Sequence, residues 1–279
     1  MDRHVYALDF DGVLCDSCGE SSLSAVKAAK VRWPSLFADV SAEVEEMILK
    51  QMREVRRGEV RPVVETGYEN ILLVRLLLEM ACEDKRQSQL SKSGKLSLEA
   101  ILSGWEGEIK PAVMADWGEE GRREELVELF GAVRDEWMRD DLPGWIAANA
   151  MYAGVPEALQ KAESPLYIVT TKQTRFALAL LRELAGVDFP EDKVFGLGTG
   201  PKVQTLQHLQ SLPQHQGCSF HFVEDRLATL RNVISTPQLD GWNLYLGTWG
   251  YNTEQERQEA AQIPRIQMVD LPEFCSSLE

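Results

Sequence analysis

Residues 4–12 read HVYALDFDG, and the architecture of the rest of the chain can be worked out from them. The run from His4 to Phe10 is short, apolar and followed by a DG turn, which is typical of a buried strand. Asp9 and Asp11 flank Phe10 at the end of this strand. Two carboxylates so placed can divide nucleophilic or metal-binding work from proton transfer. An acidic turn after a strand is also common, so this stretch alone leaves both interpretations open.

From about residue 154 onward, strand-like and helix-like segments alternate. The expected strands are 165–170, 193–197, 219–223, 242–248 and 265–269, and the expected helices are 173–185, 200–210, 226–234 and 253–261. Alternation of this kind predicts parallel strands joined by crossover helices. In open parallel sheets, ligands bind at the carboxyl ends of the strands, so residues that follow the strands are the candidates for function.

About 135 residues without a convincing strand separate the first strand from the others. Helical patterns cover 41–57, 63–81 and 120–139, and the polar segment 83–97 is expected to be a loop. We therefore predict an α/β fold, with a doubly wound parallel sheet built from residues 1–15 and 151–279. An all-helical domain, residues 16–150, is inserted after the first strand.

Polar side chains follow the other predicted strands. Thr170 and Thr171 offer hydroxyls for a phosphate oxygen, and Glu224 and Asp225 offer the oxygen ligands that Mg²⁺ prefers. Lys202 falls in the first turn of a helix, where it opposes the helix dipole unless an anion lies beside it. Each feature also has an ordinary explanation: threonines at strand ends, a surface lysine and a helix cap.

Taken in order, these motifs resemble those of the haloacid dehalogenase (HAD) superfamily, in particular its phosphoglycolate phosphatase-like members. The segments that correspond to the four family motifs are DFDGVLCDS (9–17), IVTTK (168–172), GPKVQTL (200–206) and FVEDR (222–226). YAGVPEAL (152–159) and TWGYNT (248–253) are further matches. The resemblance implies a Rossmann-like core with a helical cap inserted after the first strand.

The resemblance also implies a Mg²⁺-dependent phosphatase that acts on a small phosphorylated metabolite. Asp9 would form an aspartyl-phosphate, and Asp11 would protonate the leaving group and activate water. The phosphoryl oxygens would be held by Thr170, Thr171 and Lys202. The implied metal ligands are Asp9, Asp11, Glu224 and Asp225.

Two departures from the family pattern keep alternatives open. Thr229 and Leu230 stand where many relatives carry a further acid, and Arg226 stands where a small residue is usual. A phosphomutase of the same superfamily, or a catalytically weak protein that binds a partner through its cap, are the alternative functions. In the cap, Arg57, Arg61 and Tyr68 are candidate substrate contacts, and a solvated helix junction is the competing explanation.

The composition excludes several classes of function. The chain has 279 residues with 29 basic and 44 acidic side chains, a net charge of −15, which argues against broad binding to nucleic-acid phosphates. No apolar stretch approaches the length of a membrane span, and no targeting segment is expected. Five scattered cysteines suit a reducing cytoplasm, although a redox role for the pair Cys15 and Cys18 stays open.

Overall fold

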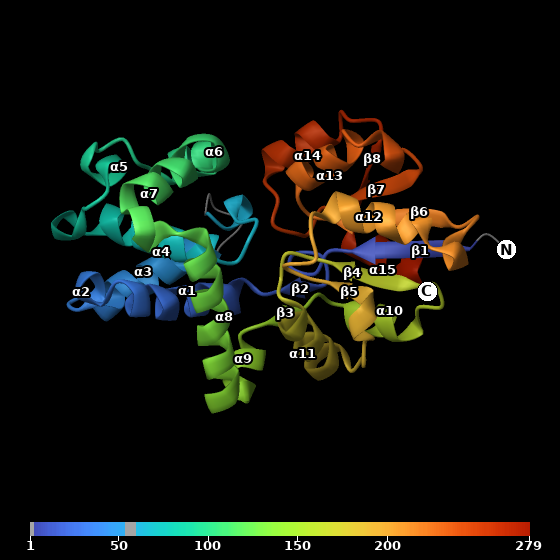
Figure 1. Cartoon of the computed structure of the whole chain (residues 1–279), viewed down its shortest axis with the longest axis horizontal. Helices are drawn as coiled ribbons and strands as arrows, with labels where there is room; N and C mark the ends of the chain where they lie inside the picture. Colours follow the sequence, from blue (N-terminus) through green and yellow to red (C-terminus); the bar gives the residue numbers. More distant parts are fainter. Residues whose placement is uncertain (1–2, 54–59) are drawn as a thin grey trace. The chain divides into compact units, whose positions relative to one another are not determined.

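The computed structural model describes residues 3–53 and 60–279 (Figure 1). The chain divides into two compact units. The first, which we call the core unit, consists of Met1–Ser17 and Asn149–Glu279. The second, the helical unit, consists of Cys18–Ala148. In the described part of the chain, no helix has the length and apolar character needed to cross a membrane.

The core unit contains a six-stranded sheet in which every pair of neighbouring strands is parallel. The strands, in spatial order, are β5 (Val194–Phe195), β4 (Leu166–Val169), β1 (His4–Leu8), β6 (Ser219–Glu224), β7 (Trp242–Gly247) and β8 (Ile266–Val269). The chain adds strands on one side of β1 and then on the other, so the strand order reverses beside β1. This reversal is the topological switch point at which such sheets bind ligands. The predicted doubly wound α/β fold is confirmed.

Helices join the strands of the core unit where the sequence predicted them. They are α11 (Thr174–Ala185), α12 (Lys202–Ser211), α13 (Leu227–Ile234) and α14 (Glu254–Ala260). Helix α10 (Val155–Lys161), which precedes β4, was not predicted. Gly186 ends α11 in a left-handed conformation with φ of 65°, as its position after the apolar pattern suggested. Helix α15 (Leu271–Leu278) was not predicted; it begins where the Asp270 side chain accepts a hydrogen bond from the amide of Glu273.

A second, two-stranded sheet lies at the two ends of the insertion and was not predicted. Strand β2 (Cys15–Asp16) pairs in antiparallel fashion with β3 (Ala150–Met151). The amide of Tyr152 adds a hydrogen bond of 3.1 Å to the carbonyl of Leu14. The chain therefore leaves the core unit and returns to it at one place, directly after the loop that carries Asp9 and Asp11.

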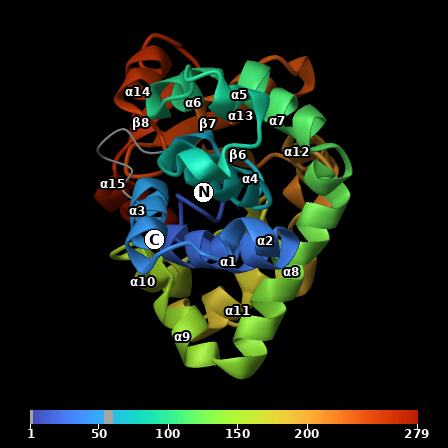
Figure 2. The ribbon, with the colours of Figure 1, turned by 90° about the vertical axis from the view of Figure 1, so that its left-hand side faces the viewer.

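The helical unit is built around α4 (Glu69–Ala81), which is buried on nearly all sides (Figure 2). Helices α1 (Cys18–Arg32) and α3 (Ala42–Arg53) pack against α4, and α8 (Arg123–Asp140) packs against α1. Shorter helices complete this unit, namely α2 (Pro34–Phe37), α5 (Gln89–Lys92), α6 (Leu98–Gly104), α7 (Lys110–Trp117) and α9 (Leu142–Ala147). A buried ion pair between Glu20 and Arg134, with contacts of 2.7 and 2.8 Å, joins α1 to α8.

Two local predictions in this unit were wrong. The segment 83–97 is not a simple loop, because it contains a 3₁₀ turn at Glu83–Lys85 and helix α5. The helix predicted over 63–81 begins only at Glu69, whose carboxylate accepts hydrogen bonds from the amides of Glu65 and Thr66. Pro62 lies in a separate 3₁₀ turn, Arg61–Val63.

Candidate active site

The loop after β1 is a tight turn that places Asp9 and Asp11 at the carboxyl end of the sheet. The amide of Gly12 donates to the carbonyl of Cys15, and the amides of Leu14 and Cys15 donate to the carbonyl of Phe10. These three amides are therefore not the donors to a phosphoryl group. Gly12 has a φ of +88°, and a Cβ atom there would lie 2.0 Å from Oδ2 of Asp225. The turn thus requires glycine for its conformation and for its close packing against Asp225.

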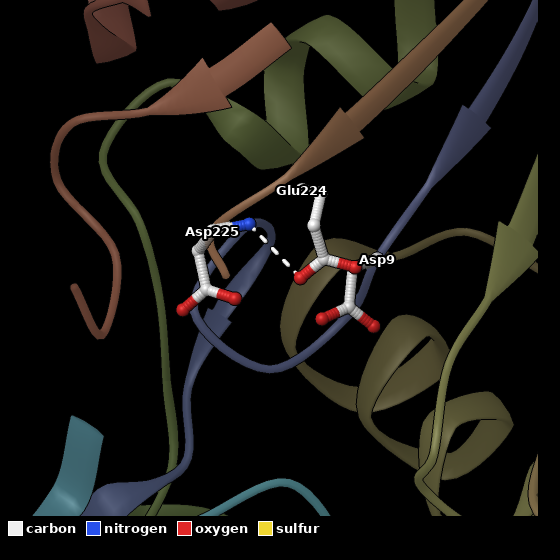
Figure 3. Close-up of side chains that lie close together, drawn as sticks. All are labelled: Asp9, Glu224 and Asp225. Atoms are coloured by element: carbon white, nitrogen blue, oxygen red, sulfur yellow. Dashed lines mark hydrogen bonds between the residues drawn. The ribbon is translucent and has the colours of Figure 1, made fainter. Parts of the chain in front are cut away.

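Three buried carboxyl groups meet at the ends of β1 and β6 (Figure 3). Asp9, Glu224 and Asp225 each place a carboxylate oxygen within 4.8 Å of the others. Their exposed fractions are 6%, 0% and 1%, respectively. Buried like charges at this separation repel each other and lack the screening of water, so the cluster needs cations to stay ionised.

Lys202 supplies one such cation from the first residue of α12. Its Nζ lies 2.9 Å from Oδ1 of Asp9 and 2.7 Å from Oε2 of Glu224. Burial alone would lower the pKa of Lys202, but the two carboxylates outweigh it and raise this pKa above its ordinary value. The anions expected beside a lysine in the first turn of a helix are therefore the carboxylates of the cluster itself.

One cation does not balance the cluster. Burial raises the pKa of Asp9 to about 7 although Lys202 opposes this shift, and the nearby Glu224 and Asp11 add to it. Oδ1 of Asp9 is buried, and its contact with Nζ of Lys202 is the ion pair of 2.9 Å. The buried carboxylate of Asp9, with those of Glu224 and Asp225 beside it, offers the oxygen ligands that a hard divalent cation such as Mg²⁺ prefers.

The two residues at the end of β6 are not equivalent. Oε1 of Glu224 accepts hydrogen bonds of 3.1 Å from the amides of Asp225 and Arg226, while its Oε2 faces Lys202. Glu224 is thus engaged at both oxygens and anchors Lys202 and the start of the next turn. Asp225 accepts a hydrogen bond of 2.6 Å from the amide of Tyr251 at Oδ2.

The threonines follow β4, which neighbours β1 in the sheet. Thr170 is buried, and its Oγ1 accepts a hydrogen bond of 3.1 Å from the amide of Lys172. Because that oxygen is the acceptor, the hydroxyl hydrogen can be donated to an anion. Thr171 is half-buried and is the next residue of the same turn.

Lys172 contacts Asp11, a contact that was not predicted from the sequence. Its Nζ lies 2.9 and 3.2 Å from the two carboxylate oxygens of Asp11. Ser17 Oγ donates a further hydrogen bond of 2.5 Å to Oδ1 of Asp11. Lys172 belongs to the segment IVTTK, but the prediction used only its hydroxyls. A lysine directly behind a strand end was the signal available.

The segment TWGYNT (248–253) forms hydrogen bonds with residues next to the site. Besides its amide contact with Asp225, Tyr251 donates from its hydroxyl to Oδ1 of Asp16 at 2.7 Å and accepts from the amide of Ser17 at 2.9 Å. Asn252 donates from Nδ2 to the backbone carbonyl of Asp225 at 2.9 Å. This segment therefore ties the acidic turn after β6 to the point where the chain leaves the core unit.

Of the candidate substrate residues, Arg61 and Tyr68 lie in the helical unit. Arg57 falls outside the described residues. Arg61 is buried and donates from its guanidinium to the carbonyl of Val64 at 3.3 Å. Tyr68 is buried in the apolar core of the unit, where the guanidinium of Arg123 lies 5.6 Å from the centre of its ring. A substrate role for these residues stays a prediction.

The structure also bears on the cysteine pair. Cys15 is fully buried in the core unit, and burial raises the pKa of its thiol well above the usual range. A reactive thiolate is therefore disfavoured at this position. Cys18 is buried in the helical unit, where its thiol approaches the carbonyl of Met52 at 3.1 Å.

Comparison with known proteins gave matches among solved structures. No protein-family model and no curated protein matches the sequence. A predicted phosphoglycolate phosphatase from Haemophilus somnus 129PT is 16% identical, with a TM-score of 0.56 over 100% of this chain and 99% of that chain. A predicted phosphatase from Clostridium acetobutylicum is 14% identical, with a TM-score of 0.51 over 99% of this chain and 98% of that chain. At these identities the likeness shows the fold alone, and the chain shares the fold of these two predicted phosphatases.

Proposed function

We propose that this protein is a Mg²⁺-dependent phosphatase that hydrolyses a small phosphorylated metabolite through an aspartyl-phosphate. The observation that carries the proposal is the position of Asp9 between Lys202 and the acids at the end of β6. A buried carboxylate at the topological switch point, beside an ammonium group and a candidate cation site, is suited to attack on a phosphorus atom.

The first half of the reaction transfers the phosphoryl group to the protein. An oxygen of Asp9 forms a bond to phosphorus while the bond from phosphorus to the ester oxygen breaks. Asp11 gives a proton to that ester oxygen, which leaves as an alcohol. Lys202 and the hydroxyls of Thr170 and Thr171 are proposed to hold the phosphoryl oxygens during this transfer.

The second half restores the protein. Asp11, now a carboxylate, takes a proton from a water molecule as that water attacks phosphorus. The bond between phosphorus and Asp9 breaks, so inorganic phosphate leaves and the Asp9 carboxylate is regenerated. One residue thus serves as acid and then as base, which requires that its side chain stay in place through both halves.

Asp9 and Asp225, with Glu224 and the carbonyl of Asp11, are the residues that would hold Mg²⁺. When bound, the ion would offset the negative charge of the carboxylates and of the phosphoryl group. The protein's own part is to keep these oxygens oriented, through the Tyr251 amide on Asp225 and the backbone amides on Glu224.

A turnover assay tests the proposal. The purified protein should release inorganic phosphate from simple phosphate monoesters with Mg²⁺ present, and a chelator should stop the release. Asp9→Asn should abolish turnover, whereas Asp240→Asn should not, because Asp240 is exposed and precedes β7 at the opposite end of the sheet. Phosphate transfer to a second hydroxyl in place of release would identify the phosphomutase alternative. Chelator-resistant turnover, or an active Asp9→Asn protein, would overturn the proposal.

A further inference from the structure

Asp11 is held from two directions within the core unit. Lys172 approaches both of its carboxylate oxygens, at 2.9 and 3.2 Å, from the end of β4. Ser17 donates to Oδ1 at 2.5 Å from the segment that follows β2. These contacts fix the plane of the carboxyl group as well as its position, because one donor bridges the two oxygens and the other meets a single one.

The position of Lys172 is itself fixed. Its amide donates to Thr170 Oγ1, and its carbonyl accepts a hydrogen bond of 2.9 Å from the amide of Leu197. Gly196 packs so closely that a Cβ atom there would lie 2.7 Å from the Lys172 carbonyl oxygen. The side chain then crosses Phe10, whose ring centre lies 5.7 Å from Nζ, to reach Asp11.

The burial of Lys172 points to a specific purpose. Its side chain has an exposed fraction of 0%. Removing an ammonium group from water is costly unless a well-placed partner compensates, so a lysine that serves only to fill space would be unfavourable here. The partner that the structure provides is Asp11, at hydrogen-bond distance from both oxygens.

We propose that Lys172, together with Ser17, is a positioning residue that holds the Asp11 side chain in the orientation needed for proton transfer to and from the reacting oxygen. The inference rests on the proposed function, which gives Asp11 this role. It assigns Lys172 an effect through Asp11 and not through the phosphoryl group. A displacement of a proton-transferring group by about 1 Å can slow a reaction by on the order of 10²-fold, so the expected effect is large.

The test is a double-mutant cycle with two substrates. We expect Lys172→Met to lower kcat for an alkyl phosphate by roughly 10²-fold with little change in KM. The loss should be much smaller for p-nitrophenyl phosphate, whose leaving group departs with little need of a proton. Adding Lys172→Met to Asp11→Asn should slow the alkyl phosphate no further. Lys161→Met is the matched control, because Lys161 also forms an ion pair, with Glu279 at 2.8 Å, but is 60% exposed.

Several outcomes would overturn the inference. Losses in the double variant that multiply, equal losses with both esters, or a large rise in KM would show that Lys172 acts by another route. If Lys172→Met does not fold, the same measurements are made on Ser17→Ala. We then expect kcat to fall more for the alkyl phosphate than for p-nitrophenyl phosphate, with both losses smaller than those expected for Lys172→Met. If the unaltered protein turns over no ester, the proposed function has failed. In that case the positioning role is tested by crystal structures of the unaltered protein and of Lys172→Met. An Asp11 carboxyl group that has the same orientation in both would refute the positioning role.

Discussion

Asp9→Asn is expected to abolish turnover and at the same time to make the metal-free protein more stable. Burial raises the pKa of Asp9 to about 7 in the folded protein, against about 3.9 for an aspartate in an unfolded chain. Each unit corresponds to about 1.4 kcal/mol, so an ionised Asp9 lowers the free energy of unfolding by about 4 kcal/mol relative to its neutral form. Asparagine has nearly the same shape and carries no charge, so it avoids this cost.

The sign of the pH dependence follows from the direction of the shift. The pKa of Asp9 is higher in the folded state than in the unfolded state. The favourable contribution of Asp9 to the free energy of unfolding is therefore complete below about pH 4 and is lost as the pH rises to about 7. The stability gap between Asp9→Asn and the unaltered protein should therefore be small at pH 4. It should grow as the pH rises from 4 to 7 and should level off near about 4 kcal/mol above pH 7.

Urea unfolding in the presence of a chelator measures this gap. Asp240→Asn, the exposed control, should show a small gap that does not grow between pH 5 and pH 8. Saturating Mg²⁺ should narrow the gap for Asp9→Asn, because the ion binds the ionised carboxylate of the unaltered protein and stabilises the folded state. An Asp9→Asn protein that is less stable than the unaltered one at pH 8 would refute the argument that burial makes the ionised Asp9 carboxylate unfavourable, whatever happens to its activity.

Three further predictions concern single positions. Gly12→Ala should cost about 1–3 kcal/mol through its positive φ and should also reduce activity by displacing Asp225, whereas Gly94→Ala, with φ of +69° and nothing within 4 Å of its new Cβ, should leave activity unchanged. Arg134→Met should cost about 3–5 kcal/mol in urea unfolding, because it leaves Glu20 buried without its partner, and a simultaneous Glu20→Leu change should recover much of the loss. Burial lowers the pKa of His221 to about 4, so the favourable contribution of His221 to the free energy of unfolding is present above pH 6.5 and is lost as the pH falls towards 4. The decline of the unfolding free energy at acid pH should therefore be shallower in His221→Asn.

The extent to which the fold could be predicted depended on the length of each element. Strands such as β6 and β7 could be predicted because their short length and their aromatic or β-branched residues favour a buried strand over a helix. Strands β2 and β3 have two residues each, too few to show any periodicity, and their pairing depends on the helical unit returning the chain to its point of departure.

The residues of the site also fall into those that the sequence predicted and those that it did not. Asp9, Lys202, Glu224 and Asp225 could be selected because each follows a strand or opens a helix, and parallel topology brings those positions to one edge. The contacts of Lys172 and Tyr251 depend on which way a side chain turns after its strand ends. Sequence spacing carries no information on that direction. Motif-level prediction therefore identified the groups proposed to react and missed the groups that hold them.

The charges at this edge of the sheet offer a reason for the proposed metal dependence. Four carboxyl groups, those of Asp9, Asp11, Glu224 and Asp225, face two buried or nearly buried ammonium groups, those of Lys172 and Lys202. When all are ionised, two negative charges are left, and a phosphate monoester brings up to two more. A divalent cation would offset the deficit of the protein, and its binding would compete with protonation of Asp9, because burial raises the pKa of Asp9 to about 7 and Glu224 and Asp11 add to this shift. Removing Lys202 would deepen the imbalance, so Lys202→Met should impair turnover even at saturating Mg²⁺, and the rate should not recover when the phosphate ester is raised in concentration. Recovery at high substrate would mean that Lys202 contributes to binding alone and that the charge balance does not govern the chemical step.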